Sequence, residues 1–415
     1  MHPIYLDHNA TTPLLPAAWD AMRPIMTETF GNSSSAHSAG RKARQALEDA
    51  REQIAALLGA SPTEVIFTSG ATEANNLAVF GLIAGAIPSA FPTPSSAFLI
   101  PSSTLGVPRS EFHAPRSEFP VHILASPLEH PCVIEPLRQL EGCGFAVEWL
   151  PVSPRGVVSA EAVPALIREN TRLVSVMLVN HETGAIQPVR EIAASLPTGI
   201  PLHTDAAQAV GKIQIHFHEL GVAALTASAH KFRGPKGVGV LLLKRGTPLR
   251  PMLFGGHQQQ GRRPGTEPVA LAVGMAVAIE HALREWDAHR ARLDAIGDRF
   301  RSRLQAEASP VVWNGPEPGT PAYLPTTLNV SFPGCRADLL LVALDLVGVA
   351  CSTGSACSSG SLLPSPVLRA MGVPDEVLRS AIRFSFGPTL TDADIDEAAG
   401  RIGNAVRRLR VPTSA

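Results

Sequence analysis

Residues 64–243 alternate between short apolar stretches typical of buried strands and longer stretches with helical periodicity. Parallel strands need long crossover connections, and helices that supply them cover both faces of the sheet. We therefore expect an α/β fold with a mostly parallel, seven-stranded sheet and helices on both faces. The predicted strands are 64–68, 121–125, 146–150, 172–179, 202–205, 225–228 and 238–243.

The pattern changes after Gly265, which suggests a second structural unit. Residues 268–306 predict one or two long helices, and shorter strand and helix patterns follow as far as residue 409. A chain of 415 residues is also longer than one hydrophobic core usually supports. We expect a large domain over 15–265 and a smaller α+β domain formed by 1–14 together with 266–415.

The segment 87–120 interrupts the alternation. It holds seven prolines and seven serines, and the pentapeptide Pro-Arg-Ser-Glu-Phe occurs in it twice. Such a composition buries too little apolar surface to order itself. We expect a surface insertion in the large domain, and a functional lid is the less favoured interpretation.

Charge and cysteine content exclude several classes of protein. The 35 basic and 36 acidic residues leave a net charge of −1, so neither nucleic acid nor a membrane surface is an expected partner. Five scattered cysteines do not form a disulfide framework, which favours a reducing, cytoplasmic setting. No targeting segment and no uninterrupted apolar span is evident.

Polar side chains follow the predicted strands at the edge where α/β proteins bind ligands. After 64–68 come Gly70, Ala71 and Thr72 at the start of a helix, and its free N–H groups suit a phosphate. An ordinary helix start has the same composition. Three later strand ends contribute Asn180, Asp205, Gln208, Ser228, His230 and Lys231.

A lysine at such an edge, with an acidic residue one strand away, favours a Schiff-base enzyme. Pyridoxal phosphate needs a lysine for its covalent link and an acid that keeps its ring nitrogen protonated. Lys231 and Asp205 fit these two needs. Lys236, in a Gly-Pro-Lys-Gly turn, is the rival lysine, but it follows the strand less directly.

Ten short motifs resemble, in order, those of the NifS/IscS-type cysteine desulfurases, which are class V, fold-type I pyridoxal-phosphate enzymes. The segment 87–120 is the main departure, while His8 and the run 258–260 are smaller ones. The resemblance implies conversion of L-cysteine to L-alanine by a homodimer. The motifs lie at 5–12, 31–37, 68–76, 129–130, 179–184, 203–208, 228–231, 263–266, 352–357 and 382–385.

The resemblance also implies a role for each residue around the cofactor ring. Lys231 would form the Schiff base and move the Cα proton, while Asp205 would pair with the ring nitrogen. Asn180 and Gln208 would bond the side of the ring that carries the phenolic oxygen. His130 would stack on the ring as acid or base, although taken alone it could simply begin a helix.

Further residues are implied to bind the phosphate and the substrate. The phosphate would lie at the helix start with Thr72, Ser228 and His230, and Thr266 would reach it from the partner subunit. Arg383, with Asn180, would grip the substrate carboxylate, because a guanidinium fork matches a carboxylate. Taken alone, Arg383 could equally be a buried ion-pair residue of an apolar strand.

Cys357 is the cysteine whose surroundings suit sulfur transfer. It lies in Ser-Thr-Gly-Ser-Ala-Cys-Ser-Ser-Gly-Ser, a flexible composition that suits an accessible thiolate. Cys351 lies in an apolar strand pattern and reads as a core residue. We expect Cys357 to take the substrate sulfur as a persulfide and to deliver it to an iron–sulfur scaffold or another acceptor.

Three alternatives stay open at this point. Another class V enzyme is possible, and of these a selenocysteine lyase differs only in its preferred substrate. A non-catalytic paralogue that binds partners is the alternative from a different class. A metal site at His216 and His218, placed on one face of a predicted strand, lacks further ligands.

Overall fold

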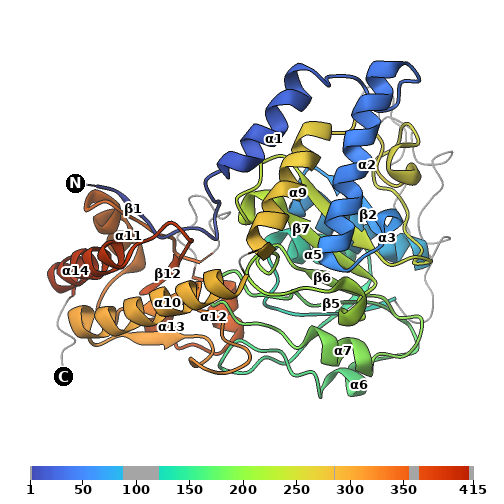
Figure 1. The fold of residues 1–415 in the computed structure, drawn as a ribbon. Helices are drawn as coiled ribbons and strands as arrows, with labels where there is room; N and C mark the ends of the chain where they lie inside the picture. Colours follow the sequence, from blue (N-terminus) through green and yellow to red (C-terminus); the bar gives the residue numbers. More distant parts are fainter. Residues whose placement is uncertain (1, 87–120, 285, 355–363, 411–415) are drawn as a thin grey trace, which may run out of the picture.

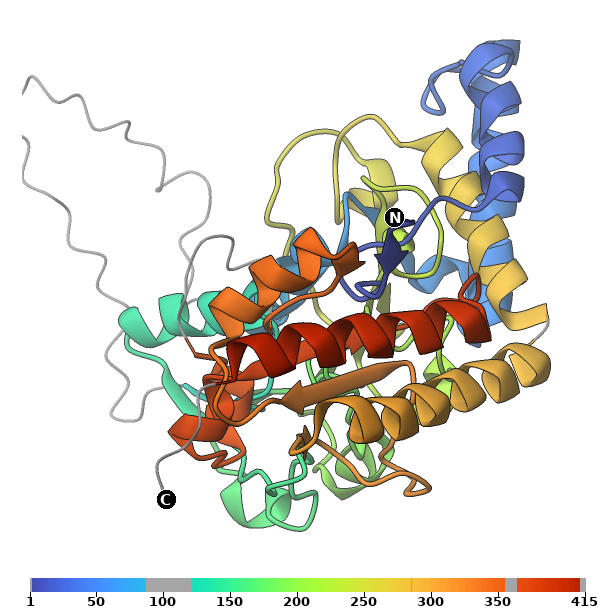
Figure 2. The same ribbon diagram turned by 90° about the vertical axis from the view of Figure 1, so that its left-hand side faces the viewer.

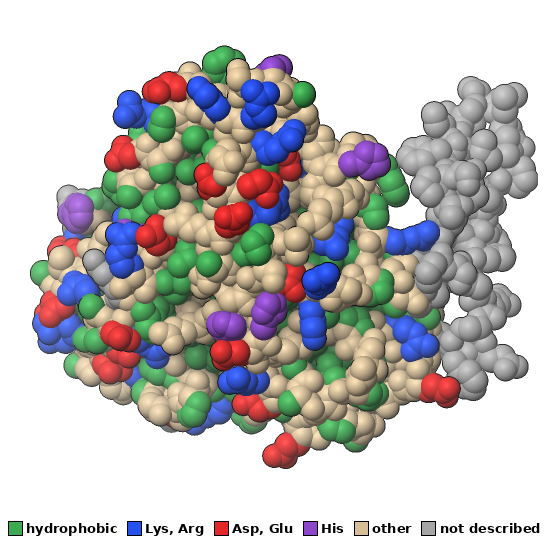
Figure 3. Space-filling model, turned by 45° about the vertical axis from the view of Figure 1, so that its right-hand side comes forward, with side chains coloured by type: hydrophobic (Ala, Val, Ile, Leu, Met, Phe, Trp, Pro, Cys, Tyr) green, Lys and Arg blue, Asp and Glu red, His purple; other side chains and the backbone are tan. Residues whose placement is uncertain are grey.

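The computed structural model describes residues 2–86, 121–284, 286–354 and 364–410 (Figure 1). The segment 87–120 and Cys357 therefore lie outside the described residues. Within the described ranges, no helix is both long and apolar enough to cross a membrane. Basic and acidic side chains are interspersed over the face drawn in Figure 3, in line with the net charge of −1.

A seven-stranded sheet forms the centre of the larger part, in the order β2-β8-β7-β6-β5-β3-β4. All neighbours pair in parallel except β8, which is antiparallel to both β2 and β7. The predicted seven-stranded, mostly parallel sheet is confirmed. Its strands are β2 (Val65–Thr68), β3 (His122–Ala125), β4 (Ala146–Trp149), β5 (Thr171–Ser175), β6 (Leu202–Asp205), β7 (Ala224–Ser228) and β8 (Gly239–Leu243).

Helices cover both faces of this sheet because alternate strand residues point to opposite sides. Ile66 packs in a core with helices α3 and α5, whereas its neighbours Val65 and Phe67 pack in a larger core with α2 and α9. Figure 1 shows α1, α2 and α9 together on one side. The helices of this part are α1 (Pro16–Thr27), α2 (Ser38–Leu58), α3 (Ala71–Ala86), α5 (Pro131–Gly142), α6 (Val163–Leu166), α7 (Val189–Ser195), α8 (Phe217–Leu220) and α9 (Val269–Arg284).

The C-terminal part has its own core around a small antiparallel sheet, in the order β12-β10-β9. Helices α10 and α14 lie side by side over it (Figure 2). The N-terminal strand β1 (Ile4–Tyr5) pairs in parallel with β11 (Val349–Ala350), so the chain begins in this part. The other elements are α10 (Trp286–Ala308), β9 (Val312–Asn314), β10 (Thr327–Ser331), α11 (Ala337–Leu346), α12 (Pro366–Ala370), α13 (Asp375–Leu378), β12 (Ala381–Ser385) and α14 (Asp392–Leu409).

Three local features differ from the sequence-based expectations. The strand predicted over 172–179 ends at Ser175, and residues 216–219 contribute to the short helix α8 instead of a strand. Gly221, at φ 73°, ends that helix in a left-handed conformation that glycine adopts without strain. Helix α1 was not predicted, and it begins with a proline at its first position.

Helix α9 bears on where the two domains divide. Its residues Val269, Met275 and Ile279 are buried in the core of the large sheet, whereas Phe300 and Leu304 of α10 belong to the C-terminal core. We propose that the division lies between α9 and α10, later than the boundary near residue 265 that the sequence suggests.

Helix α11 offers a matched pair of leucines for testing the C-terminal core. Leu344 is 0% exposed in that core, whereas Leu346 is 80% exposed on the same helix. Leu344→Ala should lower the free energy of unfolding by about 2–5 kcal/mol, because it removes buried methyl groups and leaves a cavity. Leu346→Ala should change it by less than about 0.5 kcal/mol. Equal losses in urea titrations of the two variants would contradict this placement of the core.

Candidate active site

A cavity of about 480 Å³ opens beside the carboxyl ends of β6 and β7 and the start of α3. The fold brings most of the predicted site residues to its wall, because β6 and β7 are neighbours in the sheet and the segments after β2 and β3 end at the same edge. The rival lysine, Lys236, also lies there. The predicted residues on the wall are Gly70, Ala71, Thr72, His130, Asp205, Gln208, Ser228, His230 and Lys231.

One end of the cavity is shaped by the start of α3. Gly70 has φ 153°, and a Cβ placed there would have only the Ser228 hydroxyl as a neighbour, at 3.7 Å. The first helical turn therefore faces open space with its unpaired N–H groups. Glu73 closes the turn by accepting from the Ser69 N–H at 2.7 Å and pairing with Arg263. This end can take an anion such as a phosphate.

Asp205 supplies a buried carboxylate at the end of β6. It is 4% exposed, and its oxygens accept from the Asn75 amide at 2.7 Å and from the Ala207 N–H at 2.8 Å. The sequence analysis did not single out Asn75, although it lies within the matched motif 68–76. Glu129 lies nearby, and burial, together with the charge of Asp205, raises the pKa of Glu129.

Lys231 ends a short 3-10 turn, Ala229–Lys231, that follows β7 directly. Its Nζ donates to the carbonyl of Asn9 at 2.6 Å and to that of Ala10 at 3.0 Å. The N-terminal segment that crosses the site thus holds the lysine in place. Asn9 is a second residue whose part in the site the sequence analysis missed, and its position inside the motif 5–12 was the only signal.

His130 lies both at the start of a helix and on the cavity wall. Its side chain caps α5 by accepting from the Cys132 N–H at 3.2 Å, and its ring lines the cavity. The ring of His181 lies edge-on to it, with centroids 5.2 Å apart. Burial lowers the pKa of His130, so the ring is held in its neutral form, which can accept a proton.

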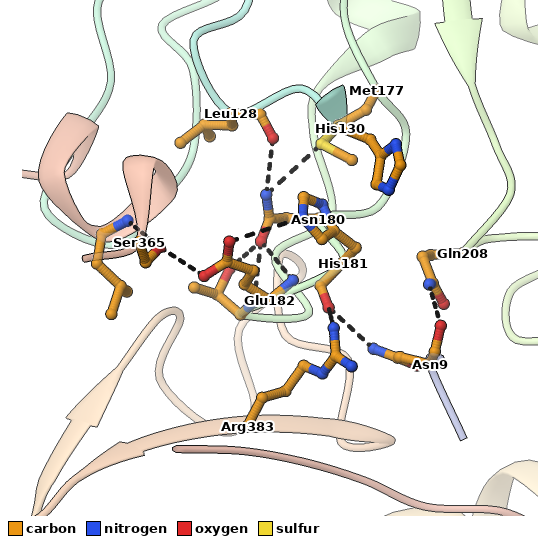
Figure 4. A network of polar contacts seen from close by, with 12 residues as sticks. Asn9, Leu128, His130, Met177, Asn180, His181, Glu182, Gln208, Ser365 and Arg383 are labelled. Atoms are coloured by element: carbon orange, nitrogen blue, oxygen red, sulfur yellow. Dashed lines mark hydrogen bonds and ion pairs between the residues drawn. The ribbon is translucent and has the colours of Figure 1, made fainter. Parts of the chain in front are cut away.

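Asn180 and Arg383 lie close to the cavity but not on its wall (Figure 4). The Asn180 carbonyl oxygen accepts from the backbone N–H groups of Glu182 and Thr183, and its amide donates to the Leu128 carbonyl. This bonding shapes the turn that follows Val179.

Arg383 is 2% exposed and pairs with Asp7 at 2.7 Å. It also donates to the His181 carbonyl at 3.2 Å. Arg383 therefore forms the buried ion pair that the alternative interpretation of this strand residue predicted. Arg383 Nε finds no hydrogen-bond partner within the described ranges, so the guanidinium retains a donor for a ligand.

The last two predicted residues are not brought to the cavity by the described chain. Thr266 is exposed in the loop before α9. Cys357 lies outside the described residues, but both flanks of its segment contact Glu182. Ser365 donates to the Glu182 carboxylate at 2.5 Å, and a Cβ on Gly354 would lie 3.0 Å from it. Burial raises the pKa of Cys351, which opposes thiolate formation there.

Comparisons with known proteins match this arrangement over nearly the whole chain. The family model described as aminotransferase class V matches residues 4–88 and 116–397, so the gap falls within the segment 87–120. The chain belongs to the class V aminotransferase family. Its relatives place it among the IscS/NifS-type cysteine desulfurases, and membership of class V implies dependence on pyridoxal phosphate.

The relatives are similar over their full lengths. Cysteine desulfurase IscS of Dictyoglomus turgidum is 41% identical, with 98% of this chain and 95% of the relative covered. The IscS-like cysteine desulfurase of Mycobacterium tuberculosis is also 41% identical, with 98% and 97% covered. A solved NifS-like protein has a TM-score of 0.83 at 33% identity, covering 98% of this chain and 100% of its own.

No cluster of three or more His, Cys, Asp or Glu residues that could hold a metal ion occurs in the part of the chain that the structure describes. His218 instead contacts the Glu64 carboxylate at 2.8 Å. The two histidines considered as ligands flank or lie in helix α8, where their rings are 6.5 Å apart.

His203 should make this desulfurase less stable in acid. It lies buried in β6 beside Asp205, between the hydroxyls of Ser175 and Thr226, and burial lowers its pKa to about 3. Below the unfolded value of about 6.5, the unfolded chain binds a proton that the folded chain excludes, so folding weakens as pH falls.

His203→Gln should therefore reduce the slope of the unfolding free energy between pH 6 and 4 by about 1.4 kcal/mol per pH unit. Urea titrations at several pH values measure that slope. Parallel curves for the variant and the natural sequence would show that His203 does not exclude the proton.

Proposed function

We propose that this chain uses pyridoxal phosphate to convert L-cysteine to L-alanine and that Cys357 takes up the released sulfur. The observation that carries the proposal is the shared cavity wall, where Lys231, Asp205 and the open start of α3 meet. The desulfurase relatives support the same chemistry, and one similar solved structure is SspA in complex with cysteine, 32% identical with a TM-score of 0.75.

The residues present fit the cofactor. The phosphate would lie at the open turn after Gly70, where a side chain would otherwise fill the space, with Ser228, His230 and Thr72 beside it. Asp205, a buried carboxylate, would keep the ring nitrogen protonated. Once bound through Lys231, the cofactor supplies an electron sink for negative charge that develops on the substrate.

Lys231 and His130 would move protons in the reaction. The Lys231 amine, when it is not linked to the cofactor, would take the proton from the substrate Cα. The neutral ring of His130 is available to accept or return a second proton, since burial disfavours its charged form. Gln208, which also lines the cavity, would donate to the phenolic oxygen of the ring.

Arg383 would bind the substrate carboxylate with Asn180. Its ion pair with Asp7 orients the guanidinium, and Nε, which has no hydrogen-bond partner among the described residues, provides a further donor. Binding would require a small displacement of this pair, because Arg383 lies just behind the cavity wall. A buried guanidinium gains more from a carboxylate than an exposed one does, since little solvent screens it.

Cys357 would complete the reaction by attacking the substrate sulfur as a thiolate. The new S–S bond forms while the Cβ–S bond breaks, and the electron pair stays with the three-carbon fragment. Protonation of that fragment gives alanine, and the sulfur remains on Cys357 as a persulfide. We propose that this sulfur is then transferred to an iron–sulfur scaffold or another acceptor protein. The low number of cysteines favours a reducing setting, the cytoplasm, for this transfer.

A homodimer would complete the site. Thr266 is exposed in one copy of the chain and would reach the phosphate of the second copy, as the resemblance implies. Exposed apolar side chains near this loop and on α1 support a partner there. They include Phe254 at 69%, Trp19 at 49% and Phe30 at 77% exposure.

Cys357→Ser tests the sulfur acceptor. The variant should keep its bound cofactor and its absorption spectrum, yet lose persulfide and at least about 100-fold of its alanine formation, since the nucleophile is gone. Alanine assay and mass analysis of the protein after incubation with L-cysteine provide the measurement.

Cys143→Ser, which alters an exposed cysteine, is the matched control and should leave both readouts unchanged. Undiminished alanine formation in the Cys357 variant would overturn the assignment. Parallel assays with selenocysteine decide the remaining alternative, because a selenocysteine lyase would turn over that substrate in strong preference to cysteine.

Lys231→Ala and Lys236→Ala separate the two lysines on the cavity wall. The first should abolish the long-wavelength absorption of the covalently bound cofactor and reduce turnover by at least about 1,000-fold, because both the link and the proton acceptor are lost. The second should keep that absorption. If the long-wavelength absorption is lost in the Lys236 variant and kept in the Lys231 variant, the covalent link must be assigned to Lys236.

A further inference from the structure

A second buried lysine lies behind the proposed cofactor site. Lys212 is 8% exposed and lies four residues after Gln208, in the turns that follow β6. Its Nζ donates to the side-chain oxygen of Gln208 at 2.5 Å and to that of Asn9 at 2.6 Å. No role was assigned to Lys212 from the sequence. A buried cation is costly unless it is fully hydrogen-bonded, so this contact calls for an explanation.

The contact with Lys212 fixes the orientation of the Gln208 side-chain amide. Burial and the nearby charges of Lys231 and Arg383 lower the pKa of Lys212, but its Nζ still lies between two side-chain oxygens and donates to both. The atom of the amide next to Lys212 is therefore the Gln208 oxygen. The Nε2 atom is thereby turned the other way, where one of its N–H groups donates to the Asn9 carbonyl at 3.0 Å. Among the described residues, its second N–H makes no hydrogen bond, and Gln208 lines the cavity.

Asn9 joins this contact to the catalytic lysine. Its carbonyl accepts from both Gln208 and Lys231, while its side-chain oxygen accepts from Lys212. The Asn9 amide is fixed in turn, because its nitrogen donates to the His181 carbonyl and the Thr327 hydroxyl. The arrangement is therefore determined at every atom.

We propose that Lys212 is a positioning residue of the active site, which locks the Gln208 amide so that an N–H group stays directed at the phenolic oxygen of the bound cofactor. The proposal rests on the proposed function, because it requires the cofactor in the cavity. Replacing Lys212 by an apolar side chain would leave the Asn9 carbonyl as the remaining contact that orients the amide, so the amide would turn more readily and present its oxygen instead. Two oxygens would then face each other, and the cofactor oxygen would prefer to hold a proton.

Absorption spectra of the holoenzyme test this inference without relying on turnover. In Lys212→Met, the cofactor population with a protonated ring oxygen should rise, and the ratio of its short- and long-wavelength bands should change about two- to tenfold. That range is the equilibrium factor for one net hydrogen bond. Lys244→Met, at an exposed lysine, is the matched control and should leave the ratio unchanged.

A double variant shows whether Lys212 acts through Gln208. Gln208→Leu should change the band ratio by itself, and adding Lys212→Met should then change it no further. If the two changes add independently, or if Lys212→Met binds cofactor with an unaltered spectrum, the inference is overturned. A purely structural role would lower stability and leave the spectrum of bound cofactor unchanged.

Lys212→Gln keeps N–H donors for the side-chain oxygens of Asn9 and Gln208. It replaces the Met variant in this test if that variant does not fold. An amide both donates and accepts, so it no longer dictates the orientation of Gln208, and the band ratio should again change. An unchanged ratio would overturn the inference. Failure of the natural sequence to bind the cofactor would instead overturn the proposed function, so the two failures are distinguishable.

Discussion

The site depends on the path of the N-terminal segment from β1 across the carboxyl ends of the sheet. β1 pairs with β11, and the residues that follow bond to both parts of the molecule. Asp7 pairs with Arg383 of β12, while the Asn9 carbonyl accepts from Lys231 after β7. The first dozen residues thereby tie the lysine and the arginine of the proposed chemistry together, although these two lie far apart in the sequence.

Burial gives these polar contacts their weight. In a low dielectric, charged groups interact strongly and an unpaired one is costly, so each is matched by a partner or loses its charge. Asp205 has amide donors and Arg383 has Asp7, whereas burial holds His130 and His203 in their neutral forms. The cavity wall therefore brings the Asp205 carboxylate and the Lys231 amine together with neutral imidazoles, which suits proton transfer to and from a bound substrate.

Sequence patterns predicted the central sheet well because each strand has strong, local β-branched or apolar character. They failed where tertiary context decides, as at helix α8, where His216 before the helix and His218 within it suggested strand alternation. They also missed Asn75, in helix α3, and Lys212, in the turns after β6, because the local sequence does not show whether a polar residue is buried or exposed. Only the packing of α3 and of the turn after β6 shows that these side chains are buried beside Asp205 and Gln208.

The sequence by itself determined the order of strands and helices, the family, and the residue types available for catalysis, since these depend on local composition and spacing. Tertiary structure alone decided which of those residues meet. Strand order in the sheet places the ends of β6 and β7 side by side, and the returning N-terminal segment adds Asn9. The tertiary structure also decided the charge state and orientation of buried groups, because burial and hydrogen-bond partners arise only from long-range packing.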